Sequence, residues 1–367
     1  MTNSQQKLFG KRSFLDFTLN GKPIEGKPHL MIDNNVRVEL WDHGVLYFHP
    51  QGDSLQQSIL LSVGVHGNET APIEIIDQLV SDIFAGKIVV KQNLLIVIAN
   101  LQSIKASCRE VVENMNRLFN NNFTPKSDDS DERERSRRLM KYSQHFFNQP
   151  ALQKVHYDLH TAIRGSVYKK FAISPNASEL PTTGYQYGLL GQWGIEAILS
   201  TQQNSPTYSA FTANTCGATS FTLELGQVKP FGENDLDDFS SVIAGLKATI
   251  SDDEYLPMNN KVAKRFSVAV EVLKQTDNFR LGFSSDTVNF TEFEVGDVLA
   301  TDKDYQYIVA SSGERILFPN EQVAIGQRAL VIIRPQDNVE ASTLCTKLKS
   351  LLLAAQATLQ PSYCVIY

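Results

Sequence analysis

The chain has 367 residues, enough for one large domain or two smaller ones with a substantial core. Its hydrophobic content of 42% and charged content of 20% are ordinary for a globular protein, and its net charge of -6 argues against nucleic acid as a partner. Residues 1–12 have no long apolar core, so we expect neither a signal peptide nor a membrane anchor. The cysteines are scattered without a CxxC pair, which favours reduced thiols in a cytoplasmic protein: Cys108, Cys216, Cys345 and Cys364.

The first part of the chain predicts a βαβ unit. Residues 57–65 and 93–99 are apolar runs of strand length, as expected in a sheet that is covered on both faces. Between them, residues 71–86 carry apolar side chains at helical spacing and end at Gly86, a residue typical of a helix C-terminus. Later segments predict strands at 154–161 and 220–226 and an amphipathic helix at 234–250. We therefore expect an α/β domain over residues 1–254, with a mostly parallel sheet flanked by helices.

A smaller, β-rich domain is expected over residues 255–367. The segments FSVAVEVLK, FRLGF, YQYIVA and RALVIIR are separated by turn signals between residues 262 and 335, which predicts mainly antiparallel strands. Residues 342–359 have the spacing of an amphipathic helix that packs back on the first domain. The charge-rich tract at 127–142 is expected to be the solvated edge of a helix that follows a mobile loop.

Polar residues follow the predicted strands where ligands usually bind, at the carboxyl ends of an open parallel sheet. In LLSVGVHGNETA the first apolar run ends in His66 and Glu69, with a glycine on either side of the histidine that allows a tight turn. The strand KVHYDLHT ends near His160, and Asp158 lies two residues earlier on the same face. Two histidines and a carboxylate suit a catalytic zinc ion, which takes three protein ligands and leaves one position open for water.

Structural alternatives remain open for each of these residues. The pair His66 and Glu69 also fits a helix N-terminus, with Asn68 as the cap and Glu69 in the first turn. His160 alone is more typical of a hydrogen-bonded structural histidine than of a metal ligand, and His156 receives no role. Spacing alone therefore supports the metal site and the structural interpretation about equally.

A second polar cluster contains Arg109 and the adjacent pair Asn116 and Arg117. Guanidinium groups bind carboxylates in bidentate geometry, and an asparagine amide can add a donor. Beside a zinc site, these groups would suit an anionic substrate or a carbonyl oxygen that becomes an oxyanion. An exposed loop or helix would explain the same residues equally well. Glu224, in the strand SFTLELG, is flanked by apolar residues and is a further candidate.

The segments GVHGNET, CREVVENMNRLF, DLHTAIRGS and FTLELG, taken together and in this order, resemble the succinylglutamate desuccinylase/aspartoacylase family, relatives of the zinc carboxypeptidases. The resemblance covers residues 60 to 226, and DLHTAIRGS is most similar to the succinylglutamate desuccinylase branch. It implies a carboxypeptidase-like α/β fold with a mixed sheet. It also implies site roles: His66, Glu69 and His160 as ligands of one zinc ion per subunit, Glu224 as general base, Arg109 at the oxyanion, and Asn116 and Arg117 at the substrate carboxylate. A tyrosine that closes over the substrate in aspartoacylases has no clear match in residues 315–321.

The activity implied by this resemblance is hydrolysis of N-succinyl-L-glutamate to succinate and L-glutamate, a late step in arginine breakdown through succinylated intermediates. Such a substrate carries three carboxylates. Arg164 follows His160 closely and is a candidate for one of them, with an exposed surface arginine as the alternative. The competing functions are a related N-acyl amino acid deacylase, a zinc carboxypeptidase, and a binding protein that keeps the fold without the metal.

Overall fold

The computed structural model describes residues 2–52, 57–120, 126–175, 183–201, 205–252 and 262–336. The helices of these residues are α1 (Asn3–Phe9), α2 (Phe14–Asn20), α3 (Thr70–Phe84), α4 (Leu101–Lys105), α5 (Asp131–Phe147), α6 (Thr183–Gln192), α7 (Tyr208–Cys216) and α8 (Ser240–Ser251), with short 3-10 turns η1 (Asp33–Asn35), η2 (Met115–Arg117) and η3 (Leu236–Phe239). The strands are β1 (His29–Ile32), β2 (Val36–Asp42), β3 (Val45–Pro50), β4 (Gln57–Val63), β5 (Asn93–Ile98), β6 (Gln153–Ala162), β7 (Phe171–Pro175), β8 (Ala197–Thr201), β9 (Thr219–Gln227), β10 (Lys264–Leu273), β11 (Arg280–Leu281), β12 (Val298–Asp302), β13 (Tyr305–Ile308), β14 (Arg315–Leu317) and β15 (Arg328–Pro335).

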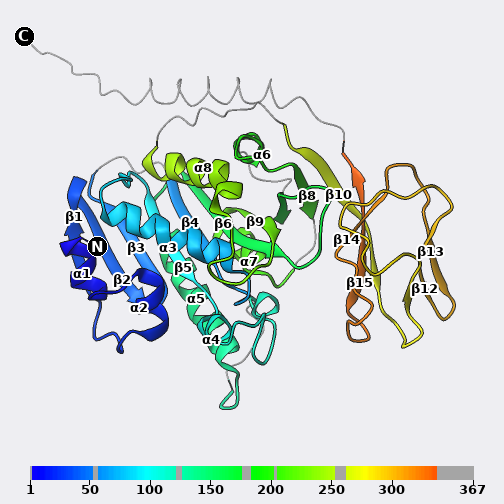
Figure 1. Ribbon diagram of the computed structural model, residues 1–367, viewed down its shortest axis with the longest axis horizontal. Helices are drawn as coiled ribbons and strands as arrows, with labels where there is room; N and C mark the ends of the chain where they lie inside the picture. Colours follow the sequence, from blue (N-terminus) through cyan, green and yellow to red (C-terminus); the bar gives the residue numbers. More distant parts are fainter. Residues whose placement is uncertain are drawn as a thin grey trace, which may run out of the picture.

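One large mixed sheet runs through the molecule, in the order β1-β2-β3-β5-β4-β6-β9-β7-β8-β10-β15-β14 (Figure 1). Its centre is parallel, because β4 pairs in parallel with both β5 and β6, and β6 pairs in parallel with β9. Antiparallel strands extend both ends, and β11, β12 and β13 form a separate small sheet. The α/β class with a β-rich C-terminal part is confirmed, and the carboxyl ends of β4, β6 and β9 meet at one edge.

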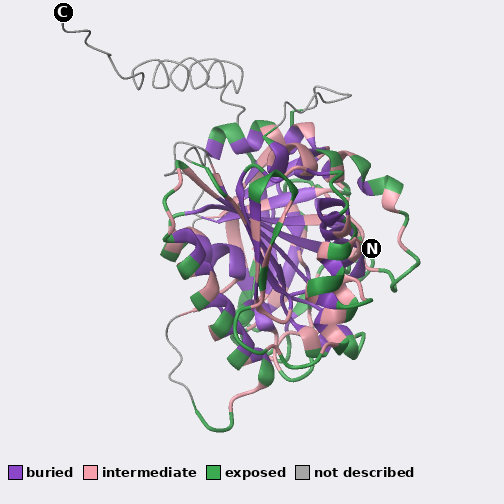
Figure 2. Cartoon of the chain, turned by 90° about the vertical axis from the view of Figure 1, so that its left-hand side faces the viewer, coloured by how far each residue is buried: buried purple, intermediate pink, exposed green. Residues whose placement is uncertain are grey.

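Helices cover both faces of the sheet and bury its apolar side chains (Figure 2). On one face α1, α2, α3, α6 and α8 contribute to the core, with Ile76 and Leu246 among the buried residues. On the other face α5 and α7 contribute Leu139 and Phe211. Strands covered on both sides have no solvated face, which explains why β4 and β5 are continuous apolar runs in the sequence.

Most of the predicted elements are present. In the first half, the predicted segments correspond to β4, α3, β5, β6, β9 and, for residues 234–250, η3 followed by α8. Gly86 has a φ of +71°, as expected just beyond a helix C-terminus. In the second half, the four β-rich segments correspond to β10, β11, β13 and β15. The expected boundary at residue 254 and the expected helix at 342–359 lie outside the described residues.

The N-terminal elements were not predicted, and β10 joins the two halves of the chain. The strands β1, β2 and β3 extend the large sheet beyond β5. At the other end β10 pairs in parallel with β8 and antiparallel with β15.

Cys108 and Cys216 are free thiols. Among the described residues, no helix is both long enough and apolar enough to cross a membrane.

The charge-rich tract at 127–142 forms most of α5, and one edge of this helix is solvated as expected, with Glu134, Arg138 and Lys141 exposed, but its opposite side is buried, which the sequence did not indicate. The helix α5 buries one side against the sheet, with Leu139 and the guanidinium of Arg135 on it. Arg135 donates hydrogen bonds to the carbonyl oxygens of His43 (2.7 Å), Ile98 (3.0 Å) and Ala99 (3.0 Å) and to Asp42 (2.9 Å). A buried arginine is tolerated here because carbonyl oxygens at strand ends accept its protons.

Replacing Arg135 by alanine should lower the free energy of unfolding by about 3 kcal/mol or more, since the buried carbonyl oxygens and the Asp42 carboxylate would lose their hydrogen-bond donor. Urea unfolding measures this change. Arg138→Ala is the matched control, because Arg138 lies on the same helix and 3.4 Å from the same carboxylate, but is more than half exposed. Its loss should cost at most about 1 kcal/mol. Equal effects of the two substitutions would contradict the structural role of Arg135.

Candidate metal centre

The turn between β4 and α3 brings His66 and Glu69 to the edge of the sheet. Gly64 has a φ of +66°, a conformation that favours glycine. At Gly67 a Cβ atom would lie 2.1 Å from the backbone carbonyl carbon of Ser103, so no larger residue fits there. The backbone N–H of Gly67 donates to the carbonyl oxygen of Arg109, at 3.3 Å. The glycines therefore make the turn tight and place it against the segment that carries Arg109.

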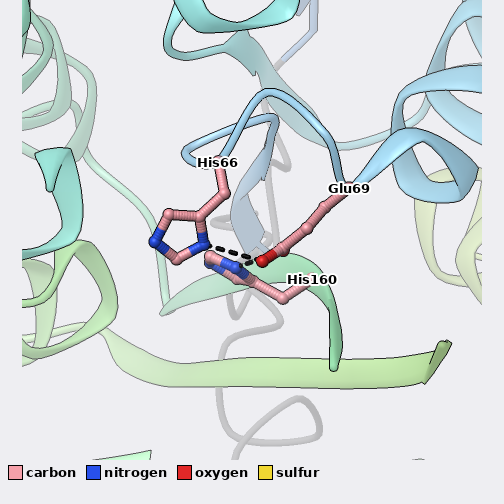
Figure 3. Close-up of side chains that lie close together, drawn as sticks. All are labelled: His66, Glu69 and His160. Carbon is pink, nitrogen blue, oxygen red and sulfur yellow. Dashed lines mark hydrogen bonds and ion pairs between the residues drawn. The ribbon is translucent and has the colours of Figure 1, made fainter. Parts of the chain in front are cut away.

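His66, Glu69 and His160 converge in a buried cluster (Figure 3). Glu69 lies between the two histidines: its Oε1 is 2.8 Å from Nδ1 of His66, and its Oε2 is 2.8 Å from Nδ1 of His160. One donor atom from each residue falls within 4.8 Å of the other two. These three side chains, from the β4–α3 turn and from β6, could hold a metal ion.

The outer nitrogens of both imidazoles are also hydrogen bonded. Nε2 of His66 is 3.1 Å from the side-chain oxygen of Asn114, and Nε2 of His160 is 3.0 Å from Oδ2 of Asp158. The side-chain oxygens of Asn114 and Asp158 accept hydrogen bonds, and so do the two Glu69 oxygens on the other side of the rings. A metal ion bound in the cluster would replace the protons on the nitrogens that face Glu69, and the Nε2 atoms would keep their bonds to Asn114 and Asp158. Metal-ligating histidines in proteins commonly have such outer partners.

The cluster favours positive charge at its centre. Burial lowers the pKa of His66, although Glu69 opposes this. Burial also disfavours charge on His160, but the carboxylates of Asp158 and Glu69 outweigh it and raise the pKa of His160 well above its usual value. Burial would raise the pKa of Glu69, yet the two histidines hold it well below the usual range. Two carboxylates around one imidazole provide negative charge that a metal cation can neutralise.

Glu224 lies on β9 directly opposite His160 on β6 in the register of the parallel pair. Its Oε2 is buried and has no hydrogen-bond partner among the described residues. Burial raises the pKa of Glu224 to about 7, with Glu69 and Asp158 acting in the same direction and His160 and Arg109 opposing. A carboxyl group with a pKa near neutrality and a free oxygen is suited to accepting and returning a proton.

Arg109, Asn116 and Arg117 lie in the chain that follows α4. NH1 of Arg109 donates to Oε1 of Glu69 at 3.0 Å, and its side chain remains about one third exposed. Asn116 is buried, and its side-chain oxygen accepts from the backbone N–H of Tyr208 at 3.0 Å. Burial, together with the positive charges of Arg328 and Arg109, lowers the pKa of Arg117 to about 10. The guanidinium of Arg117 stays charged at neutral pH, close to other cations, where a bound anion would relieve the repulsion.

Arg164 makes its contacts with the C-terminal part of the chain. Its NH1 donates to the carbonyl oxygens of Thr287, at 2.8 Å, and Ser285, and its NH2 donates to that of Pro319, at 3.3 Å. Within the described chain, Arg164 forms no hydrogen bond or ion pair with the other candidate residues. These hydrogen bonds connect the loop after β6 to the β-rich part.

Sequence reasoning missed Asn114 and the residues behind Asp158. Asn114 occurs in the quoted segment but has no distinctive spacing, and its contact with His66 depends on the path of the chain after α4. Ser62 donates to Oδ1 of Asp158 at 2.5 Å. A hydroxyl inside the apolar run of β4 was the available signal, since buried polar groups need partners.

These features define an α/β protein with a candidate metal centre at the carboxyl ends of its central parallel strands. Residues 56–250 match the succinylglutamate desuccinylase/aspartoacylase catalytic domain, and residues 261–336 match the barrel-sandwich hybrid domain of the same family. The chain therefore belongs to the succinylglutamate desuccinylase/aspartoacylase family.

Similar proteins cover nearly the whole chain. A succinylglutamate desuccinylase of Shewanella frigidimarina is 37% identical over 332 residues, which are 89% of this chain and 96% of that protein. One of Idiomarina loihiensis is 38% identical, over 83% of this chain and 90% of its own. The crystal structure of succinylglutamate desuccinylase from Vibrio cholerae has a TM-score of 0.82 at 33% identity, covering 89% of this chain and 95% of that one. Murine aminoacylase 3, at 16% identity and a TM-score of 0.55 over 78% of this chain and 97% of that one, shares the fold.

Proposed function

We propose that this protein is a zinc-dependent succinylglutamate desuccinylase, which hydrolyses N-succinyl-L-glutamate to succinate and L-glutamate in arginine breakdown through succinylated intermediates. The observation that carries the proposal is the buried cluster of His66, Glu69 and His160 with Glu224 opposite His160. The similarity to succinylglutamate desuccinylases over nearly the whole chain supports the choice of substrate.

The residues present fit a zinc ion. Two imidazole nitrogens and a carboxylate are a ligand set of catalytic zinc sites, and their other atoms are held by Asn114, Asp158 and the backbone N–H of Thr161. When bound, zinc would lower the pKa of a water molecule and polarise the amide carbonyl of the substrate. We propose one zinc ion per chain, held by His66, Glu69 and His160.

Glu224 and Arg109 would carry out the steps that belong to the protein. Glu224 accepts a proton from the attacking water molecule while the oxygen of that water bonds to the acyl carbon. Glu224 later gives the proton to the leaving amine when the C–N bond breaks. Arg109, whose guanidinium is held at Glu69, donates hydrogen bonds toward the negative charge that develops on the carbonyl oxygen. The buried Oε2 of Glu224, which has no hydrogen-bond partner within the described parts of the chain, is the atom that would exchange the proton.

The substrate carries three carboxylates, and the cations after α4 can bind them. We propose that Asn116 and Arg117 hold the α-carboxylate of the glutamate half. The clustering of Arg109, Arg117 and Arg328 supports this, since an anion placed among them offsets their mutual repulsion. Arg164 remains a candidate for a second carboxylate, although its hydrogen bonds to backbone carbonyls also suit a structural role.

N-acetylglutamate, which lacks the succinyl carboxylate, should be a much poorer substrate than N-succinylglutamate, with kcat/KM lower by about a hundredfold. A charge-assisted contact is worth about 2–3 kcal/mol, and a site built for a carboxylate is left unpaired without it. Arg117→Ala should lower kcat/KM for both substrates, because both keep the α-carboxylate. Initial rates of amino acid release measure these values. Comparable kcat/KM for the two substrates would overturn the substrate assignment and leave the zinc amide hydrolase in place.

The competing functions make different predictions with the same substrates. An aspartoacylase-like deacylase would prefer an N-acetylated amino acid, and a zinc carboxypeptidase would cleave a peptide.

We also propose a cytoplasmic location, which the scattered cysteines support, and two domains, 1–254 and 255–367, supported by the two family domains that match.

A further inference from the structure

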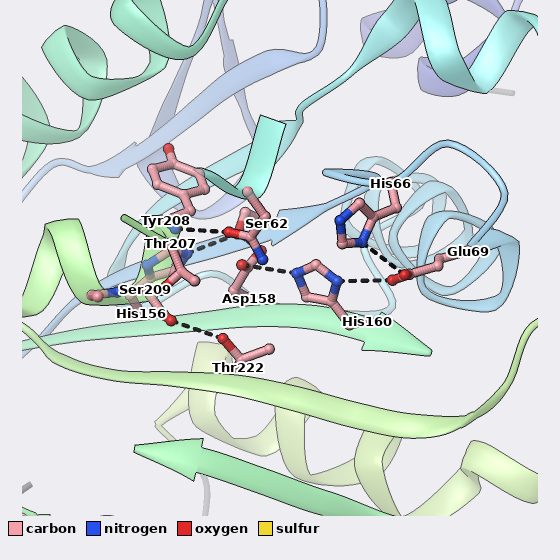
Figure 4. Close-up of polar contacts among 12 residues, drawn as sticks. Ser62, His66, Glu69, His156, Asp158, His160, Thr207, Tyr208, Ser209 and Thr222 are labelled. Carbon is pink, nitrogen blue, oxygen red and sulfur yellow. Dashed lines mark hydrogen bonds and ion pairs between the residues drawn. The ribbon is translucent and has the colours of Figure 1, made fainter. Parts of the chain in front are cut away.

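A buried chain of polar side chains lies behind Asp158, on the face of the sheet that α7 covers (Figure 4). Ser62 on β4 donates to Oδ1 of Asp158 at 2.5 Å, and its oxygen lies 2.7 Å from Nε2 of His156 on β6. Nδ1 of His156 lies 2.7 Å from the hydroxyl of Thr212 on α7. All four residues are fully buried, so the protein alone determines their hydrogen bonds.

The direction of these hydrogen bonds follows from the chemistry of their ends. The Asp158 carboxylate can only accept, so the hydroxyl of Ser62 gives it its single proton. The oxygen of Ser62 must then accept from His156, which requires a proton on Nε2 of that imidazole. Burial lowers the pKa of His156 to about 4, so the ring is neutral at pH 7. With the proton on Nε2, the lone pair of Nδ1 faces the hydroxyl of Thr212, whose proton lies within reach of Nδ1, at 2.7 Å, and of the carbonyl oxygen of Ser209, at 3.0 Å.

The same carboxylate accepts a hydrogen bond from His160. Oδ2 of Asp158 receives Nε2–H of His160, so the two oxygens of one carboxylate connect the buried chain to the cluster with Glu69. With Ser62 holding Oδ1, the carboxylate cannot rotate without losing a buried bond. His160 is thereby kept with its proton on Nε2 and its Nδ1 facing Glu69.

We propose that Thr212, His156 and Ser62 form a directed hydrogen-bond relay that positions Asp158, so that His160 presents Nδ1 to the metal. Ser62 and His156 are positioning residues, since neither touches the reacting atoms. The inference rests on the proposed function in that it takes a zinc ion at His160. It assigns a role to His156, a buried histidine outside the ligand set.

Ser62→Ala tests the relay, because it removes the donor to Asp158 and changes little volume. Competition with a chromophoric chelator should give a zinc Kd about 10- to 100-fold higher than that of the parent protein. Ser58→Ala is the matched control: Ser58 is equally buried on β4, four residues earlier, and bonds to Asn93 instead. Its zinc Kd should stay within about threefold of the parent value. An unchanged Kd in Ser62→Ala, or an equal change in both variants, would overturn the relay.

His156→Gln gives a second test should Ser62→Ala fold poorly. A glutamine amide can place an N–H near the position of Nε2 and keep the bond to Ser62, so zinc affinity should be largely retained. His156→Leu removes every polar atom and should weaken zinc binding by about tenfold or more. Equal zinc affinities of these two variants would contradict the proposed role of His156.

The tautomer of His156 can be measured without zinc. Long-range ¹H–¹⁵N NMR of the metal-free protein at pH 7 should show a neutral imidazole protonated on Nε2. A proton on Nδ1 would reverse the direction of the bonds and overturn the relay. If the parent protein bound no zinc, the proposed function would fail, and the tautomer measurement would still decide whether the relay exists.

Discussion

Replacing Glu224 by glutamine should lower kcat for N-succinylglutamate by about a hundredfold or more while one zinc ion per chain stays bound. Glutamine keeps the size and much of the hydrogen bonding of the side chain, but it cannot accept the proton of the attacking water. The proposed ligands His66, Glu69 and His160 are untouched by this change. Steady-state kinetics and metal analysis of the same preparation measure both quantities.

Glu196→Gln provides the control for this substitution. Glu196 is exposed next to β8 and accepts a hydrogen bond from the backbone N–H of Lys170. Because Glu196 is not part of the proposed site, the kcat of the Glu196→Gln variant should match that of the parent protein. Loss of zinc from Glu224→Gln would show that Glu224 is a ligand and that the proposed division of roles is wrong. Unchanged kcat with zinc bound would show that another group accepts the proton.

His160→Ala should lose most of its zinc and, with it, nearly all activity, because two remaining protein ligands are too few for a stable site. His66→Ala should behave in the same way. The His160 substitution also leaves Asp158 and Glu69 without their shared partner in a buried site, which further disfavours the folded cluster. Metal analysis after gel filtration gives the zinc content per chain.

An exposed histidine serves as the control for both ligand variants. His29, at the start of β1, lies on the surface, and His29→Ala should keep one zinc ion per chain and full activity. A His160→Ala protein that still carried one zinc ion with parental affinity would contradict the ligand assignment.

The ends of the central strands could be predicted from the sequence because two signals coincide there. The apolar residues form runs of strand length, and the polar residues follow directly where those runs end. Apolar runs of strand length marked β4 and β5, and glycine, histidine and glutamate after Val65 marked a tight turn at a sheet edge. The structure brings His66, Glu69 and His160 together as expected, and Asp158 lies beside His160 on the same strand face. Local sequence therefore carried most of the information about this edge.

Other features depend on contacts between distant segments, which no local pattern records. The relay joins Ser62 to His156, 94 residues apart, and then to Thr212 on α7. The composition around Arg135 indicated only a solvated helix edge. The buried position of its guanidinium could not be predicted, because the carbonyl oxygens that accept its protons come from the ends of other strands. Buried polar groups are positioned by tertiary partners, so their roles become visible only in the fold.

The most direct test of the central claim is the rate of N-succinylglutamate hydrolysis by thoroughly metal-depleted protein, before and after one equivalent of zinc. The proposed site predicts negligible hydrolysis without metal and recovery of most of the original rate when one zinc ion per chain is bound. Full activity in protein that metal analysis shows to be free of zinc and other divalent ions would contradict the proposal.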